Sequence, residues 1–211
     1  MNTALQMLTL NSIFETVNKN VLEEFANLAR PRNFQRVEFL CLQGEIWPHL
    51  FLIANGMIKA RKESEEGRSL QVATLYTGEL FWGLAFFEEK APMPVRLEAN
   101  DASRVYLWTR AQCLPYFYDH GALSWGICRL MVQRMLYASD IVEGLAFQPV
   151  ASRLARLLLE EFPVDQFAVE RHLTLDEMAA RIGTTREMVC RVLYRFATQG
   201  TIQINRTEFI F

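Results

Sequence analysis

The spacing of hydrophobic residues changes along the chain, and each change predicts a different kind of element. Leu5 to Ala29 places leucine and phenylalanine at helix-like intervals, which predicts one or two short helices before Pro31. From Phe34 to Trp108, short apolar or alternating runs follow one another: VEFLCL, HLFLIA, MIKARK, LQVATLY and RVYLWT. Glycines separate these runs at nearly regular intervals: Gly44, Gly56, Gly67 and Gly78. Regular short strands with glycine turns indicate an antiparallel sandwich or barrel.

The segment from His120 to Glu161 returns to helical spacing, with Pro149 as the break within it. Its apolar residues recur at alternating steps of three and four, the spacing of a coiled-coil seam: Cys128, Met131, Met135, Ala138, Val142 and Leu145. One interpretation pairs this seam with a second copy of the chain. The other packs the stripe against the β domain. Ile127, Leu130 and Ile141 belong to a second apolar face, so both interpretations can hold.

The carboxy-terminal forty residues have the pattern of two short helices joined by a tight turn. Thr174 and Glu177 have the spacing of a capping box, which predicts a helix start, and Gly183 is suited to end that helix. Thr184 or Thr185 then caps a second helix. Its apolar face consists of Val189, Val192, Leu193 and Phe196. This pattern is typical of a helix-turn-helix.

The polar face of the second helix has side chains that read base edges. Arg186, Glu187 and Arg191 lie on this face. Arginine can donate two hydrogen bonds to guanine, and glutamate can accept a hydrogen bond from the amino group of cytosine. Between Thr184 and Arg206, four arginines accompany one glutamate in a chain of net charge −2, which favours a phosphate-facing surface. Glu187 has a second interpretation, as the far half of a capping box begun at Thr184. The segments TIQI and EFIF predict a hairpin wing with Arg206 near its tip.

A glycine-punctuated β-roll, a long helix and a winged helix, in this order, resemble the CRP/FNR family of bacterial transcription factors. The motifs that carry the resemblance are RLARLLL (Arg153 to Leu159) and TTREMVCRVL (Thr184 to Leu193). The second is similar to the family's S-R-E-x-V-x-R signature, with threonine in place of serine. The resemblance implies an α+β fold with a cyclic-nucleotide-binding-like antiparallel β-roll over residues 1–119, a dimerisation helix over 120–147 and a winged helix-turn-helix domain over 148–211.

By this resemblance, the protein is a homodimeric, sequence-specific DNA-binding transcription regulator that acts on a palindromic site. Arg186, Glu187 and Arg191 would read bases, Thr185 would contact a phosphate, and the half-site would be similar to TGTGA. Pairing along the seam would hold two reading heads about one duplex turn, roughly 34 Å, apart. The expected partners are double-stranded DNA, a second copy of the chain and RNA polymerase.

The composition narrows the function further. Half of the 211 residues are hydrophobic, which is typical of a folded chain. No apolar run of 18 or more residues and no signal-peptide pattern occurs, so we expect a cytoplasmic protein without membrane attachment. Because the sequence has no nucleophile elbow, phosphate-binding glycine loop or metal motif, we expect no enzymatic activity.

The segment Gly78 to Ala99 matches the region in which cyclic-nucleotide members of the family hold their ligand. Those members use a glutamate for the ribose and an Arg-Ser pair for the phosphate. Here the glutamate falls at Gly83, and the pair falls at Met93 and Pro94. Because a buried phosphate without a cation is costly, we expect a regulator that does not depend on cyclic AMP. Arg96 would supply a cation if the register were shifted.

Aromatic residues are frequent in the same segment. They either line a pocket for a flat apolar ligand, haem included, or fill the space that a nucleotide would occupy. Haem would need an axial ligand, for which His49 and Cys41 are the candidates. The effector therefore remains unnamed. The effector pocket that the sequence predicts consists of Phe81, Trp82, Gly83 and Arg96.

The four cysteines are scattered, at Cys41, Cys113, Cys128 and Cys190, without a Cys-x-x-Cys pair or a histidine at ligand spacing. We therefore expect neither a zinc site nor an iron-sulfur cluster. Cys190 lies in the reading helix next to Arg191, where oxidation would disturb DNA contact. The alternative is that Cys190 is only a small residue at a tight place.

Overall fold

A computed structural model describes residues 3–162, 168–170, 172–205 and 208–210. Its antiparallel sheets, long helix and carboxy-terminal helix-turn-helix confirm the α+β fold expected from the sequence. The chain forms two compact units, the first made of Met1–Lys62 and Ala73–Tyr137 and the second of Glu63–Val72 and Ala138–Phe211. The boundary at 137/138 falls within one continuous helix. The three-part division by residue number therefore stays a prediction.

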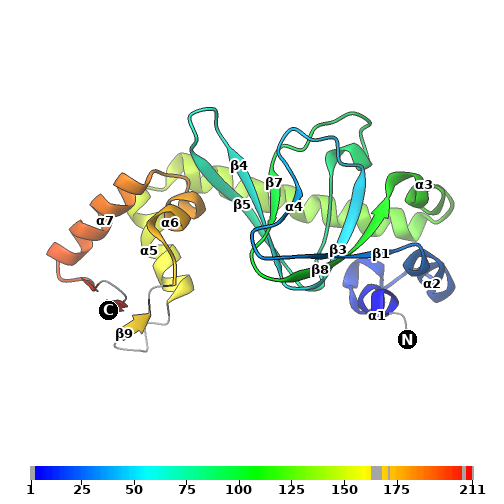
Figure 1. Cartoon of the computed structure of the whole chain (residues 1–211), viewed down its shortest axis with the longest axis horizontal. Helices are drawn as coiled ribbons and strands as arrows, with labels where there is room; N and C mark the ends of the chain where they lie inside the picture. The colour runs from blue at the N-terminus through cyan, green and yellow to red at the C-terminus, as the bar shows by residue number, and fades with distance from the viewer. Residues whose placement is uncertain (1–2, 163–167, 171, 206–207, 211) are drawn as a thin grey trace. The chain divides into compact units, whose positions relative to one another are not determined.

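The first unit begins with helices α1 (Thr3–Leu10) and α2 (Lys19–Asn27), which agree with the helical spacing there, and a 3-10 turn (Ser12–Phe14) lies between them. Eight strands follow: β1 Arg30–Phe34, β2 Phe39–Cys41, β3 His49–Asn55, β4 Met57–Glu63, β5 Ser69–Tyr76, β6 Leu80–Trp82, β7 Arg96–Ala99 and β8 Ser103–Thr109. They form two four-stranded sheets, in the orders β1-β8-β3-β6 and β2-β7-β4-β5. A glycine turn with positive φ separates β3 from β4, and another separates β5 from β6. Strands β1 and β8 run side by side in the first sheet (Figure 1).

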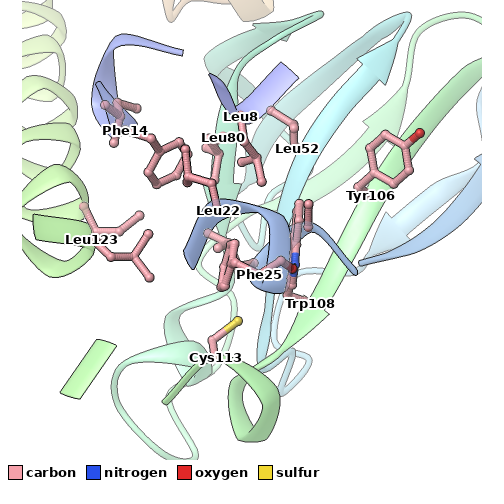
Figure 2. Packing of buried hydrophobic residues seen from close by; sticks show 14 of the residues in the cluster. Leu8, Phe14, Leu22, Phe25, Leu52, Leu80, Tyr106, Trp108, Cys113 and Leu123 are labelled. Atoms are coloured by element: carbon pink, nitrogen blue, oxygen red, sulfur yellow. The ribbon is translucent and has the colours of Figure 1, made fainter. Parts of the chain in front are cut away.

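The core of the first unit lies between one face of the first sheet, the amino-terminal helices and the beginning of helix α4 (Figure 2). Phe25 stacks on Trp108, with ring centroids 5.2 Å apart and planes at 9°. The indole Nε1 of Trp108 also donates to the carbonyl of Phe25 over 2.8 Å. Leucines from several elements complete the cluster: Leu8, Leu22, Leu52, Leu80 and Leu123.

Three helices follow the strands: α3 (Arg110–Asp119), α4 (Gly121–Phe147) and α5 (Val150–Glu161). The sequence patterns did not predict α3, which has Pro115 inside it and begins with a capping box between Thr109 and Gln112. The expected break at Pro149 is confirmed, because Pro149 is the N-cap of α5. None of the helices among the described residues is long and apolar enough to cross a membrane.

The rest of the second unit contains helices α6 (Leu175–Ile182) and α7 (Arg186–Thr198) and the strands β9 (Ala168–Glu170), β10 (Gln203–Ile204) and β11 (Glu208–Ile210). The strands pair in the order β10-β11-β9. The expected start and end of the first helix are confirmed, since both halves of the Thr174–Glu177 capping box form and Gly183 adopts φ 64°. Thr185, not Thr184, caps α7 by accepting from the amide of Met188. The alternative capping box between Thr184 and Glu187 is therefore wrong.

Candidate functional site

Helix α7 buries one face and exposes the other, as its sequence pattern predicts. Val189, Val192 and Leu193 are at most 5% exposed and pack into the core of the second unit. The opposite face leaves Arg186, Glu187 and Arg191 exposed. The arrangement is that of a helix held firmly by its apolar face while a polar face remains available.

Arg186 and Glu187, two of the polar residues on this face, are both accessible to a new partner. The guanidinium of Arg186 lies 3.5 Å from the carboxylate of Asp176, and both side chains are exposed. Such a surface pair stabilises by at most about 1 kcal/mol, so Arg186 can exchange it for another acceptor. Hydrogen bonds from its own backbone amide and from the Thr185 hydroxyl keep the pKa of Glu187 below its usual value. Glu187 is thus an ionised acceptor.

The amino-terminal end of α7 is a further part of this surface. Thr185 has extended backbone angles, and its hydroxyl accepts from the Met188 amide over 3.4 Å. The amides of a first helical turn are suited to an anion, and the phosphate contact of Thr185 stays a prediction. Arg206, the residue expected near the wing tip, lies outside the described residues. The positions of the other predicted reading residues bring them together on one helix.

One exposed residue of this face was missed from the sequence. Tyr194 is 72% exposed, three residues after Arg191 and seven after Glu187, which places it on the same side of α7. An aromatic residue at helical spacing from polar reading residues was the available signal. Cys190 is also exposed on α7.

In the sensor region, Gly83 is packed too closely to accept a side chain. A Cβ atom there would lie 1.8 Å from the carbonyl oxygen of Trp47. The amide of Gly83 donates to the carbonyl of His49 over 2.9 Å, which fixes the backbone. Met93 is 2% exposed, and its amide and carbonyl bond to Glu45 and Gly44 over 2.8 Å each. The glycine and the methionine that stand in place of glutamate and arginine are both built into the packing.

Phe81 and Trp82, on strand β6, contact aromatic neighbours. Their rings stack on one another with centroids 5.5 Å apart, and Phe81 also meets Phe51 at 5.9 Å. The guanidinium of Arg134 lies 5.8 Å from the Phe81 ring, and Trp82 packs partly against the core of the first unit. The neighbouring side chains therefore cover ring surface of Phe81 and Trp82 against which a flat ligand would stack.

Arg96 lies on strand β7 of the other sheet. Its guanidinium is 3.5 Å from the carboxylate of Glu98 and 5.7 Å from the centroid of the Phe39 ring. Leu97 and Ala99, which alternate with Arg96 and Glu98, are fully buried, so the two charged residues point to the opposite face of the strand. The carboxylate of Glu98 also lies 3.9 Å from the guanidinium of Arg61, so one acidic group is shared by the two arginines.

A cleft of about 280 Å³ does occur in the first unit, but none of the four predicted pocket residues lines it. Its walls include Asn11, Gly78, Glu79, Arg134 and Tyr137. Arg134 bonds to Glu79 over 2.8 Å, so the two charged walls neutralise one another.

The two candidate haem ligands lie on different sheets, His49 on β3 and Cys41 on β2. Burial raises the pKa of the Cys41 thiol to about 12, which disfavours the thiolate that binds iron. Burial, followed by the charge of Arg32, lowers the pKa of His49, which keeps its ring neutral. Among the described residues, no group of three or more His, Cys, Asp or Glu side chains could hold a metal ion.

Helix α4 exposes most of the predicted seam. Cys128, Met135, Ala138, Val142 and Leu145 are exposed. Met131 is half-buried and packs against the core of the first unit. Exposed residues nevertheless continue at alternating steps of three and four along the whole helix: Trp125, Cys128, Val132, Met135, Ser139, Val142 and Ala146. We refer to these seven residues as the α4 stripe.

The sequence profile of the cyclic nucleotide-binding domain matches residues 31–117, and that of the Crp-like helix-turn-helix domain matches residues 152–211. The CRP-like cAMP-activated global transcriptional regulator of Mycobacterium tuberculosis is 24% identical over 207 residues, which cover 94% of this chain and 91% of that protein. The Cyclic AMP receptor protein of Thermus thermophilus is 26% identical over 167 residues, which cover 77% of this chain and 74% of that protein.

Solved structures agree on the fold. The c-di-GMP responsive global regulator CLP of Xanthomonas campestris superposes with a TM-score of 0.77 at 19% identity, covering 92% of this chain and 99% of that chain. A structure from Eubacterium rectale assigned to the crp/fnr family gives a TM-score of 0.79 at 17% identity, covering 95% and 93%. Together with the exposed polar face of α7, the two profile matches and the similar regulators show that the chain belongs to the CRP/FNR family and is a DNA-binding, CRP-like transcription regulator.

Proposed function

We propose that this regulator is a homodimer that reads a palindromic site with two copies of α7 and does so without cyclic AMP. Independence from cyclic AMP is supported by the contact at Gly83, where the Trp47 carbonyl occupies the position that a side chain would need. A ribose-binding carboxylate cannot be placed there without moving two backbone segments. The arginine position is also changed, since Met93 is buried in the packing.

Relatives whose names refer to cyclic AMP support the fold of the sensor domain more than its ligand. They are 24% and 26% identical to this chain, so the residues that hold a ligand can differ while the strands remain. Here the aromatic contacts of Phe81 and Trp82 favour the interpretation in which side chains fill the nucleotide space.

The α4 stripe supports the homodimer. Trp125 is 66% exposed, Met135 is 65% exposed and Val142 is 65% exposed, all on one side of a single helix. An exposed stripe of heptad spacing, apolar at every position but Ser139, is suited to a second helix of the same kind, because each knob meets a hole between four residues of its partner. A second copy of the chain supplies that partner, and two-fold pairing presents two reading helices to one palindrome.

The remaining expected partner is RNA polymerase. This expectation follows from the family resemblance, since regulators of this kind act on transcription. We propose no polymerase-binding residues.

Two measurements test the proposal separately. Sedimentation velocity of the full chain is expected to give a dimer at every concentration at which the protein can be detected, whereas a monomer would contradict the dimer. Titration calorimetry with cyclic AMP is expected to give no binding heat. Saturable binding of one nucleotide per chain would show that the Gly83 region opens. This result would contradict independence from cyclic AMP and leave the dimer untouched.

A second candidate function is a thiol switch at Cys190, which the exposure of this thiol on α7 favours. Oxidation by a peroxide would convert the thiol to a sulfenic acid next to Arg191 and disturb DNA contact. The Cys190→Ser protein is then expected to keep DNA binding after peroxide treatment, while the parent loses it reversibly with thiol reductant. Equal behaviour of the two proteins would exclude the switch.

A further inference from the structure

We propose that Arg153 is a positioning residue that fixes the reading helix relative to the end of α4. Arg153 begins the RLARLLL motif, whose function the sequence did not reveal. The inference rests on the proposed reading of a palindrome by α7, and it adds the side chain that holds α7 in register with the paired part of the protein.

The guanidinium of Arg153 joins carbonyl groups from two other segments. Its Nε donates to the carbonyl of Ile182 over 2.8 Å, and its Nη2 donates to that of Gly183 over 3.5 Å. Its Nη1 donates to the carbonyls of Gln148 over 2.6 Å and Gly144 over 3.3 Å. Arg153 itself lies on α5 and is only 8% exposed. One side chain therefore ties α5 to the carboxy-terminal ends of both α4 and α6.

The chemistry of helix ends explains why a guanidinium is required here. The last carbonyl groups of a helix have no partner within it, and they form the negative end of the helix dipole. Two such ends meet at Arg153. A planar fork can donate in several directions at once, whereas the ammonium group of lysine is a compact donor on a flexible stem. We call the four carbonyl contacts of Arg153 the carbonyl clamp.

The turn between α6 and α7 is the element that the clamp fixes. Gly183 forms this turn with φ 64°, and a Cβ atom there would lie 2.4 Å from Cδ2 of Leu145 on α4. The turn is thus held by the last turns of α4 through both the clamp and Leu145. Only Thr184 separates Gly183 from Thr185, the N-cap of α7, so the position of the turn sets the position of Arg186.

The consequence concerns the distance between the two reading heads. If α4 pairs with its copy, a change in how the turn is held moves the first turn of α7 relative to the two-fold axis. The clamp therefore determines which spacing between half-sites fits the dimer. Loss of the clamp leaves the polar face of α7 intact and removes the fixed spacing.

The experiment measures affinity of the full chain for palindromes whose spacer is shortened or lengthened by single base pairs, at fixed salt. The parent is expected to prefer one spacer, while Arg153→Lys and Arg153→Met lose roughly tenfold or more on that spacer, about the effect of a mismatched base pair. Their affinity for the other spacers and for a scrambled duplex is expected to change little. Arg156→Met is the matched control, because Arg156 lies one turn along α5 and is 57% exposed, with its guanidinium paired to Glu160.

The outcomes separate this inference from the proposed function. A parent that binds all duplexes alike contradicts the reading of a palindrome. If the parent prefers one spacer and both Arg153 variants keep the same preference, only the positioning role is contradicted. The positioning role is also contradicted if the Arg153 variants lose affinity by the same factor on every spacer. If Arg153→Met does not fold, Arg153→Lys and Leu145→Ala still test the positioning role of Arg153. Leu145→Ala removes the other contact to the turn. Because Leu145 also belongs to the predicted seam, sedimentation velocity first checks that this variant is still a dimer, and its spacer preference is then expected to weaken in the same direction.

Discussion

Helix α7 and the segment around Gly83 both align with functional regions of the family, but the first is exposed and the second is closely packed. On α7 the residues that resemble the family signature are exposed and have the polar groups that base recognition needs. Around Gly83, the Trp47 carbonyl and the buried Met93 occupy the positions that the family resemblance assigns to nucleotide ligands. Glycine illustrates the difference, since Gly183 is needed for its backbone angle and Gly83 for the closeness of the Trp47 carbonyl. Under the proposed function, the fold keeps the polar surface of α7 while side chains and backbone fill the space of a nucleotide.

The largest expected effect comes from placing a charge on the α4 stripe. In Val142→Glu, two carboxylates would face one another across the pair of helices, and burial of unpaired charges is costly. The dimer dissociation constant is expected to rise about 100-fold or more, measured by sedimentation equilibrium. Leu10→Glu is the control, because Leu10 is an exposed apolar residue outside the stripe. A Val142→Glu protein that dimerises as the parent does would show that the stripe is not the interface.

The next effect concerns the reading face. Arg186→Ala is expected to lower affinity for the palindrome by about 10- to 100-fold, because a bidentate contact to guanine contributes about 1–3 kcal/mol of discrimination. Fluorescence anisotropy at fixed salt measures the loss. Arg104→Ala removes an exposed arginine of the first unit and is expected to leave affinity unchanged. An equal loss in both variants would indicate that only overall charge matters.

A smaller effect tests the closed sensor region. Gly83→Ala is expected to destabilise the first unit by about 1–3 kcal/mol, since the added Cβ overlaps the Trp47 carbonyl. Thermal melting followed by circular dichroism measures the change. Gly121→Ala provides the control, because a Cβ at Gly121 meets no atom within 4 Å. An unchanged melting temperature for Gly83→Ala would mean that the region opens freely.

The smallest expected effect is a pH dependence from His49. Burial, with the Arg32 charge as a second cause, holds the pKa of His49 below its ordinary value of 6.5. Below pH 6.5 the unfolded chain takes up a proton that the folded chain resists, so stability is complete above this pH and falls as pH is lowered. His49→Gln is expected to reduce this fall in urea titrations across that range. Identical slopes for parent and variant would contradict the assignment.

Local patterns made the DNA-binding unit readable from sequence. The Thr174–Glu177 capping box, the turn at Gly183 and the apolar face of α7 each depend on neighbours within a few residues. The features that were missed depend on residues distant in sequence. Nothing near Gly83 indicates that the Trp47 carbonyl lies against it, and nothing near Arg153 indicates the carbonyls of Ile182 and Gly183.

The α4 stripe shows an intermediate case. Heptad spacing predicts an apolar face, but two registers one residue apart fit the sequence equally well in the first half of the helix. The choice between Met131 and Val132 depends on the core, against which Met131 packs while Val132 remains 50% exposed. A helix with two apolar faces can therefore be recognised from sequence before its faces can be assigned.

Binding of a palindrome without cyclic AMP is tested most directly by fluorescence anisotropy of a labelled duplex with TGTGA-like half-sites. The titration is done at fixed moderate salt, with and without cyclic AMP, and against a scrambled duplex. We expect tight, selective binding by the dimer that cyclic AMP does not change. Selective binding that develops only with cyclic AMP would contradict it, because the Trp47 carbonyl would then have to move away from Gly83.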